Sequence, residues 1–337
     1  MKVVELQDDF GLEHLTVSSR PKPEPGHGQV LLRMRAASLN FRDLLMVRGL
    51  YNPKQTLPII PCSDGAGEVE EVGPGVSRVR VGDRVTPTFF QGWFSGRPTV
   101  EKALTTLGSP LDGVLAQYMV VGEDALVPVP GHLTFEQAAT LPCAALTAWS
   151  ALAVQGNVKA GNTVLVQGTG GVALFALQFA KLLGAQVIVT SGSDEKLKRA
   201  RRMGADHGIN YRTTPQWGKA ARDWTHGAGV DHVVELGGAG TLAESLQAVG
   251  LGGRISLIGV LAGAVKELNI LPIVMRNVRV QGIFVGHREG FEAMNRAIAQ
   301  SGLEPVIDRT FSMEEVGHAF EWMAGGNHFG KICLEIP

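Results

Sequence analysis

Apolar and polar positions follow two different patterns along this chain. Up to about residue 126, apolar residues form short alternating runs between glycines and prolines, as in residues 29–36, 65–73 and 81–87. Such runs are typical of antiparallel strands, and a helical pattern covers only residues 41–46. This part is therefore predicted to be an irregular antiparallel barrel.

Beyond residue 126, apolar strand patterns alternate with helical ones, which is typical of a parallel sheet. Strands are predicted at 164–166, 187–190, 206–211, 230–238 with a glycine turn, 254–259 and 278–285. Helices are predicted between them, and the tail should hold two helices and a strand at 331–336 that returns to the first domain. The expected fold class is α/β, a Rossmann doubly wound parallel sheet over 127–285, and the barrel of 1–126 is completed by 286–337.

A glycine turn follows the first of these strands. Gly168, Gly170 and Ala173 match the G-x-G-x-x-G/A pattern, with an apolar helix and a second strand after them. The first glycine allows a tight bend, the second lets a pyrophosphate approach the backbone, and the helix N-terminus attracts phosphate. A dinucleotide site is predicted, and a purely structural turn is the alternative. The residues expected to hold the cofactor here are Gly168, Thr169, Gly170, Gly171 and Val172.

The end of the second strand selects between two cofactors. NAD sites usually place an acid there for the ribose 2′-hydroxyl. This chain has Thr190, Ser191, Gly192 and Ser193, and Lys196 follows one turn into the next helix. Hydroxyls and an ammonium suit a 2′-phosphate, so NADP(H) is predicted. Ser193 or Asp194 can equally cap the helix 194–203, and both roles are compatible.

Composition limits the partners and the compartment. The 337 residues carry a formal net charge of −1, which argues against nucleic acid or an anionic membrane surface as partners. The first nine residues include acids where the apolar part of a signal peptide is expected, and no apolar run reaches transmembrane length. Cys62, Cys143 and Cys333 are widely spaced and odd in number, so a reducing, cytoplasmic location is predicted.

Several motifs together resemble one superfamily over the whole chain. They lie at residues 36–43 (AASLNFRD), 61–69 (PCSDGAGEV), 81–85 (VGDRV), 138–149 (AATLPCAALTAW), the Gly168 turn and 328–331 (HFGK). The order and motifs are similar to those of the medium-chain dehydrogenase/reductase superfamily. This resemblance implies a GroES-like β-barrel catalytic domain, a Rossmann domain, a cleft for a small-molecule substrate, and a homodimer paired through the last Rossmann strand.

The resemblance also raises the question of zinc. Zinc members of the superfamily bind a catalytic ion with Cys, His and Cys, and the matching positions here are Asn40, Ser63 and Cys143. An amide, a hydroxyl and one thiolate make a poor zinc site, although Asp64 and Cys62 offer alternative ligands. The loop 91–113, which is expected to border a pocket, has none of the four cysteines of the superfamily's structural zinc lobe. The protein is therefore predicted to be metal-free.

Loss of zinc changes the expected chemistry. Without a Lewis acid, acceptors that delocalise the added charge are favoured, so the prediction is a zinc-independent, NADPH-dependent oxidoreductase acting on a quinone or α,β-unsaturated carbonyl. The run Asn40 to Asp43, followed by Gly49-Leu-Tyr51, resembles the zinc-free quinone oxidoreductase-like group. A zinc-free NADP-dependent alcohol or aldehyde dehydrogenase and a non-enzymatic NADPH-binding protein remain alternatives.

Catalytic roles follow from the resemblance. Asn40 is expected to donate to an enolate oxygen, or else to stabilise a turn, and Asp43 is expected to orient its neighbours or pair with Arg42. Tyr51 is a substrate-side donor or a rim aromatic. Ser63 with its neighbour is expected to hold water, and Thr147 is expected near the nicotinamide or as a helix-terminal hydroxyl.

Further cofactor contacts are expected at the strand ends. Lys196 and Tyr211 match the 2′-phosphate grips of NADPH-linked relatives, and Lys331 matches a position near the cofactor, although a solvated lysine is the alternative. The nicotinamide half is expected at the ends of the last strands. The residues there are Gly237, Gly259, Phe284 and Val285.

Overall fold

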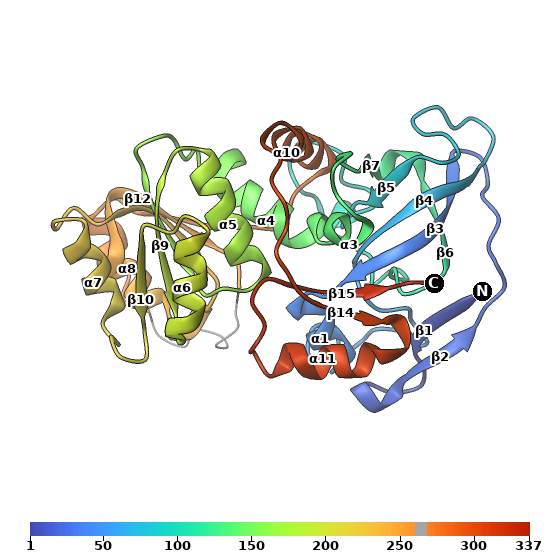
Figure 1. The fold of residues 1–337 in the computed structure, drawn as a ribbon, viewed down its shortest axis with the longest axis horizontal. Helices are drawn as coiled ribbons and strands as arrows, with labels where there is room; N and C mark the ends of the chain where they lie inside the picture. Colours follow the sequence, from blue (N-terminus) through green and yellow to red (C-terminus); the bar gives the residue numbers. More distant parts are fainter. Residues whose placement is uncertain (260–267) are drawn as a thin grey trace. The chain divides into compact units, whose positions relative to one another are not determined.

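A computed structural model describes residues 1–259 and 268–337 of the chain (Figure 1). These residues form two compact units. The first unit comprises Met1–Leu146 and His287–Pro337, and the second comprises Thr147–Gly286. The chain therefore leaves the first unit once and returns to it for its last segment.

The second unit is built on a six-stranded parallel sheet, as the sequence predicts. Its first strand in the sequence, β8 (Thr163–Gln167), is buried at all five positions, which explains its continuous apolar pattern. The order reverses between β8 and β11, so the carboxyl ends of these two strands form the switch point of the sheet. In spatial order the strands are β10 (His207–Asn210), β9 (Gln186–Ser191), β8, β11 (Val230–Glu235), β12 (Val249–Leu257) and β13 (Arg279–Gly282).

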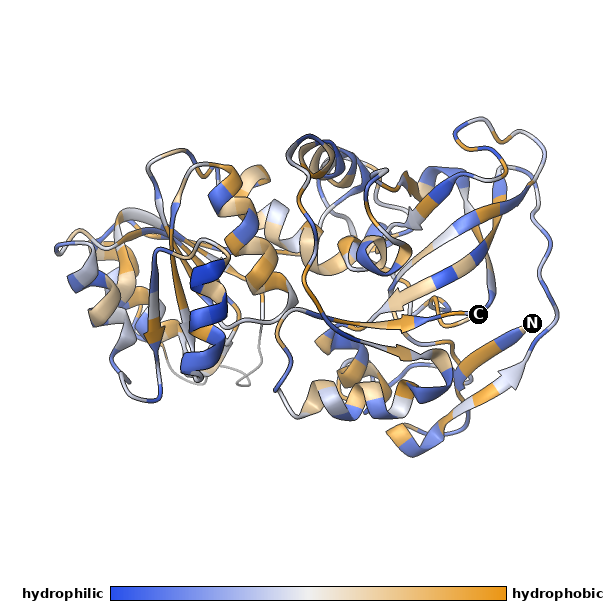
Figure 2. Cartoon of the chain, viewed as in Figure 1, coloured by the Kyte–Doolittle hydropathy of each residue, from blue (hydrophilic) through white to orange (hydrophobic). Residues whose placement is uncertain are grey.

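The helices of the second unit differ in how much they bury. The glycine turn leads into α5 (Gly171–Leu182), which buries seven of its side chains, whereas α6 (Asp194–Arg202) buries only Leu197 and Ala200. In Figure 2 α6 is accordingly deep blue and the strands of the sheet are largely orange. The helix predicted at 147–155 is instead α4 (Leu146–Trp149) followed by a π-helical segment, Ser150–Val154. The remaining helices are α7 (Trp217–Trp224), α8 (Leu242–Ala248) and α9 (Leu271–Met275).

The first unit is built on antiparallel pairing around β3 (Gln29–Ser38). This strand pairs with β4 (Asp64–Val72), β6 (Tyr118–Gly122) and β15 (Lys331–Glu335), so the predicted return of the last strand to the first domain is confirmed. The hairpin of β1 (Lys2–Leu6) and β2 (Leu15–Ser19) was not predicted. The other elements are β5 (Arg84–Pro87), β7 (Leu126–Pro128), β14 (Ile307–Ser312), α1 (Phe41–Val47), α2 (Val100–Ala103), α10 (Arg288–Ser301) and α11 (Val316–Ala324).

The boundary between the units differs from the expected one. The sequence places residues 127–146 with the dinucleotide domain, but they belong to the first unit. The reason is the helix α3 (Phe135–Ala139), which buries Ala138 and Ala139 against Ala36 and Ala66 of the first unit's strands. The switch to helical periodicity therefore occurs before the chain leaves the first unit.

No helix in the described part of the chain is both long enough and apolar enough to cross a bilayer.

A buried carboxylate fixes the start of α1. Asp43 Oδ2 accepts a hydrogen bond of 2.8 Å from the backbone N–H of Asn40, and Asp43 is only 1% exposed. Arg42 Nη1 lies 3.4 Å from the other oxygen. Burial raises the pKa of Asp43 to about 6, although the neighbouring guanidinium opposes this shift.

We expect Asp43→Asn to remove a pH dependence of stability. The pKa of Asp43 is raised from 3.8, so folding favours the protonated acid, and wild-type stability falls as the pH rises through this range. The amide does not titrate and still offers an oxygen to the Asn40 N–H. In urea unfolding, the variant should gain on wild type by on the order of 1–3 kcal/mol from about pH 4 to about pH 6. Parallel pH profiles for the two proteins would contradict this expectation.

Candidate functional site

The glycine turn at the end of β8 has the geometry that its sequence predicts. Gly168 adopts φ 76°, a left-handed conformation that glycine accepts without steric penalty, and its N–H donates to the Thr190 carbonyl at 2.7 Å. Gly170 is the N-cap of α5 and has no side chain to cover the first N–H groups of that helix. Ala173 is 1% exposed, so a small residue is needed there for packing. The turn therefore presents free backbone donors at a helix N-terminus, which suits a pyrophosphate.

Polar side chains gather where β9 and β10 end. Ser193 Oγ accepts a hydrogen bond of 3.3 Å from the backbone N–H of Lys196, so Ser193 caps α6. The Ser193 N–H in turn donates to Ser191 Oγ at 3.3 Å. Asp194 is turned toward β10, since its Oδ1 accepts from Asn210 Nδ2 at 2.8 Å. Its carboxylate is thus satisfied by a neighbouring amide.

Arg212 is a candidate site residue that the sequence analysis did not predict. A β-carbon placed on Gly192 would lie 2.8 Å from both the Tyr211 hydroxyl and Arg212 Nε, so these two side chains cover that glycine. A guanidinium, a phenol and hydroxyls converge at the end of β9. The signal in the sequence was the basic residue directly after Tyr211, but only the pairing of β10 with β9 brings it to Gly192.

A buried carboxylate ties the two strand ends at the switch point. Glu235 is fully buried and accepts hydrogen bonds of 2.9 Å from the N–H groups of Gly237 and Gly238 and one of 2.7 Å from Gln167 Nε2. Gln167 Oε1 accepts from the Gly237 N–H at 3.1 Å. The hydroxyls of Thr241 and Ser245 also donate to Glu235. The loops after β8 and β11 are therefore held as one piece.

Two of the glycines predicted to contact the cofactor are required by close packing in this region. A β-carbon on Gly237 would overlap Thr241 Oγ1, and one on Gly259 would overlap the carbonyl oxygen of Leu236. Gly259 thus brings the end of β12 against the loop after β11. Neither Gln167 nor Glu235 was predicted as a site residue, although a polar residue ending an apolar strand was a visible signal.

The segment after β13 carries two further predicted residues. Phe284 is 43% exposed, whereas Val285 is buried. Val285 adopts φ 46°, which is rare for a β-branched residue because its side chain crowds the backbone. Such strained positions cluster at functional sites, and the expected role of Val285 stays a prediction. Thr147, 3% exposed, is the first residue of the second unit.

A continuous hydrogen-bonded chain connects predicted residues in the first unit. Lys331 Nζ donates to Asn40 Oδ1 at 2.6 Å, and Asn40 Nδ2 faces Ser63 Oγ at 3.4 Å. Ser63 Oγ donates to Asp64 Oδ1 at 2.8 Å, and the backbone N–H of Cys143 donates to Asp64 Oδ2 at 3.0 Å. The structure thus brings together the three positions that replace the zinc ligands, and it adds Lys331 and Asp64.

The chemistry of these groups does not suit a zinc ion. Two of the three positions, Asn40 and Ser63, offer an amide and a hydroxyl, which are poor zinc ligands. Burial raises the pKa of the Cys143 thiol. Burial also raises the pKa of Asp64, although the charge of Lys331 opposes this shift. The ammonium of Lys331 already holds the Asn40 oxygen and would repel a cation. Within residues 1–259 and 268–337, no three His, Cys, Asp or Glu side chains are grouped to hold a metal.

Tyr51 is not part of this series of hydrogen bonds, and its ring packs against the guanidinium of Arg42. The guanidinium carbon lies 4.9 Å from the Tyr51 ring centre and 5.1 Å from that of Phe89. Arg42 also donates to the carbonyls of Leu107 at 2.9 Å and Ser109 at 3.3 Å, which belong to the predicted loop 91–113. Tyr51 is 49% exposed, so it lies at the surface of the first unit.

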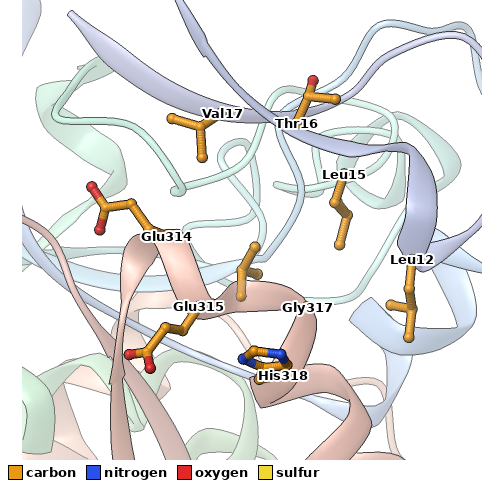
Figure 3. Close-up of a pocket in the computed structure, with 9 residues that line it drawn as sticks. Leu12, Leu15, Thr16, Val17, Glu314, Glu315, Gly317 and His318 are labelled. Carbon is orange, nitrogen blue, oxygen red and sulfur yellow. The ribbon is translucent and has the colours of Figure 1, made fainter.

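A hollow in the first unit lies elsewhere (Figure 3). Its volume of about 190 Å³ is below the usual range for ligand pockets. None of the predicted site residues lines it, so it is not a candidate for the cofactor site. Its lining residues are Leu12, Leu15, Thr16, Val17, Glu314, Glu315, Val316, Gly317 and His318.

Comparisons with known proteins cover both units. A family model described as alcohol dehydrogenase GroES-like domain matches residues 26–131, and one described as zinc-binding dehydrogenase matches residues 171–300. A zinc-type alcohol dehydrogenase-like protein of Schizosaccharomyces pombe is 44% identical over 92% of this chain and 91% of its own. An acryloyl-coenzyme A reductase of Sulfurisphaera tokodaii is 30% identical over 94% of each chain.

Solved structures agree with this assignment. An NAD-dependent alcohol dehydrogenase has a TM-score of 0.93 at 35% identity, with both chains fully covered. A mycobacterial protein in complex with NADPH has a TM-score of 0.83 at 28% identity, also with full coverage. The fold class predicted from the sequence is thereby confirmed. With its GroES-like first unit, its Rossmann sheet and these relatives, the chain belongs to the medium-chain dehydrogenase/reductase superfamily, a family of oxidoreductases that use nicotinamide cofactors.

Proposed function

We propose that this protein is a zinc-independent, NADPH-dependent oxidoreductase that reduces a quinone or an α,β-unsaturated carbonyl. The observation that carries the proposal is the chain from Lys331 through Asn40 and Ser63 to Asp64. It fills the ligand positions of the zinc members with groups that already satisfy one another. The ammonium of Lys331, at one end of this series of hydrogen bonds, supplies positive charge without a metal.

The donors in this chain match the charge that such a reaction creates. When bound, the nicotinamide supplies a hydride. A quinone or enone that accepts it at carbon moves an electron pair onto its oxygen, and conjugation spreads the charge. One or two hydrogen bonds then stabilise the oxyanion, and Asn40 is half-buried with an amide N–H group to donate. Tyr51, a second candidate donor, is a half-exposed residue on the same unit. The acryloyl-coenzyme A reductase relative, by its name, acts on an enone-type substrate.

The residues around β9 support NADPH over NADH. Arg212 and Tyr211 cover Gly192, and Lys196 lies in the first turn of α6. Asp194, the first acid after β9, keeps its negative charge, but one of its oxygens is held by Asn210 on β10. An arginine and a lysine suit a 2′-phosphate, whereas a free carboxylate would repel it. The pyrophosphate would lie at the turn from Gly168 to Val172, and the nicotinamide half beside Gly237, Gly259, Phe284 and Val285.

We expect Lys196→Ala and Arg212→Ala to weaken NADPH selectively. Each removes a charged hydrogen bond to the 2′-phosphate, so KM for NADPH should rise about 10-fold or more while KM for NADH changes little. Lys198→Ala is the matched control, because Lys198 lies on the same helix and its ammonium pairs with Glu195 at 3.8 Å. Equal losses for both cofactors would remove these residues from the phosphate site.

We expect turnover without a metal. Purified protein should oxidise NADPH with quinones or enones, and treatment with a chelator should leave kcat unchanged, because no step needs a Lewis acid. The assay should include nitroalkenes, aldehydes and, with NADP⁺, saturated alcohols, alongside metal analysis of the same sample. Stoichiometric zinc that is essential for turnover would contradict the proposal.

Two other functions have distinct signatures in the same assay. The names of several relatives favour an alcohol dehydrogenase, which would reduce NADP⁺ with saturated alcohols. An NADPH-binding protein without enzymatic activity would bind the cofactor and turn over none of these compounds. We also place the protein in the cytoplasm, since Cys62, Cys143 and Cys333 are free thiols.

We further propose a homodimer paired through β13. This strand is at the edge of the sheet and exposed at all four positions. Exposed apolar side chains lie on α9, on β13 and on neighbouring segments. An edge strand has unpaired backbone N–H and C=O groups that can pair with another chain, and a group of exposed apolar side chains is typical of an interaction surface. The exposed apolar residues are Leu251, Ile270, Leu271, Val274, Met275, Val280 and Phe284.

We expect the double variant Met275→Glu, Val280→Glu to be monomeric by analytical ultracentrifugation, since buried like charges would oppose pairing. Leu104→Glu in the first unit is the control, because that leucine is also exposed, at 61%. A wild-type protein that already sediments as a monomer would refute the dimer.

A further inference from the structure

Lys331 is a charged residue almost fully withdrawn from water. It is 3% exposed, and its Nζ donates to the carbonyl of Leu39 and to Asn40 Oδ1, both at 2.6 Å. Burying an ammonium is costly unless it is paired with acceptors. Lys331, the first residue of β15, thus uses its ammonium group to hold the two residues just before α1.

This contact fixes which way the Asn40 amide points. A lysine ammonium has three donors and no acceptor, so the Asn40 atom that faces it must be the carbonyl oxygen. The amide nitrogen therefore points away from Lys331, toward Ser63 Oγ at 3.4 Å. Ser63 favours the same orientation, because its only O–H is donated to Asp64 and it can therefore only accept from Asn40, but that contact is long, whereas the Lys331 contact is short.

The hydroxyl of Ser63 has no hydrogen left for a substrate. Its single O–H donates to Asp64 Oδ1 at 2.8 Å, and the other oxygen of Asp64 accepts from the Cys143 N–H. Ser63 and Asp64 are both fully buried, whereas Asn40 is half-buried. Asn40 has two amide hydrogens, and its amide makes a long contact with Ser63 and also interacts with the Asp64 carboxylate, which accepts from the same Ser63 hydroxyl.

We propose that Lys331 is a positioning residue that orients the Asn40 amide as a donor, so that Asn40, and not Ser63, stabilises the oxygen that gains charge in the reaction. This inference rests on the proposed reduction of quinones or enones. It also gives Lys331 a role separate from the expected cofactor contact, because both of its described hydrogen bonds are made within the first unit.

The test is a double-mutant cycle between the two residues. Lys331→Met keeps most of the side-chain length but removes the orienting donor, and it should lower kcat about 10- to 100-fold, less than the roughly 100- to 1,000-fold loss expected when an oxyanion donor is removed outright. KM for NADPH should stay within about twofold, because the orienting contact is to Asn40. In the Asn40→Ala background, Lys331→Met should cause little further loss, since there is no amide left to orient. Lys331→Arg should recover part of kcat, and Ser63→Ala should cost less than Asn40→Ala.

Each outcome bears on the proposal. If the losses in kcat multiply in the double variant, or if only KM for NADPH changes, the proposal is overturned and a contact between Lys331 and the cofactor is favoured. If Lys331→Met does not fold, as judged by thermal unfolding, Lys331→Gln takes its place, because the glutamine amide retains a donor and should keep more activity than Lys331→Ala. NADPH binding without turnover of any quinone or enone would refute the proposed function itself, which separates that failure from this one.

Discussion

An ammonium group removed from water must find acceptors, and Lys331 finds them in Leu39 and Asn40. The contact joins the last strand of the chain to the start of α1, across 291 residues of sequence. Lys331 at one end and the Asp64 carboxylate at the other set the direction of the hydrogen bonds between them, because each group has a limited number of donors and acceptors. Lys331, on the C-terminal strand β15, therefore helps to order the hydrogen bonds that join Asn40, Ser63 and Asp64.

The second unit also buries an acidic side chain together with its hydrogen-bond partners. Glu235 is a fully buried carboxylate that is satisfied by two backbone N–H groups, an amide and two hydroxyls. Through Gln167 it links the residue before the glycine turn to the loop after β11. Cooperative networks of this kind are rigid when every member is paired. The loops after β8 and β11, where we propose that the cofactor binds, are therefore held in a fixed arrangement.

Both networks lie at the ends of elements whose interiors are apolar. The strands and helices bury their hydrophobic faces, and the polar groups are left where the backbone turns. This division explains why the glycine turn, the end of β9 and the residues before α1 carry the candidate chemistry. It also explains why substitution of a buried polar partner is expected to change orientation as well as stability.

Local pattern was enough for much of this protein. The six strands of the parallel sheet and the glycine turn are properties of neighbouring residues, so apolar periodicity and motif spacing identified them. The packing of α3 on the first unit, the placement of Arg212 over Gly192 and the Lys331–Asn40 contact were decided by tertiary structure alone. Each of these contacts joins segments that are separate in the sequence, and the sequence alone does not give the distance between them in space.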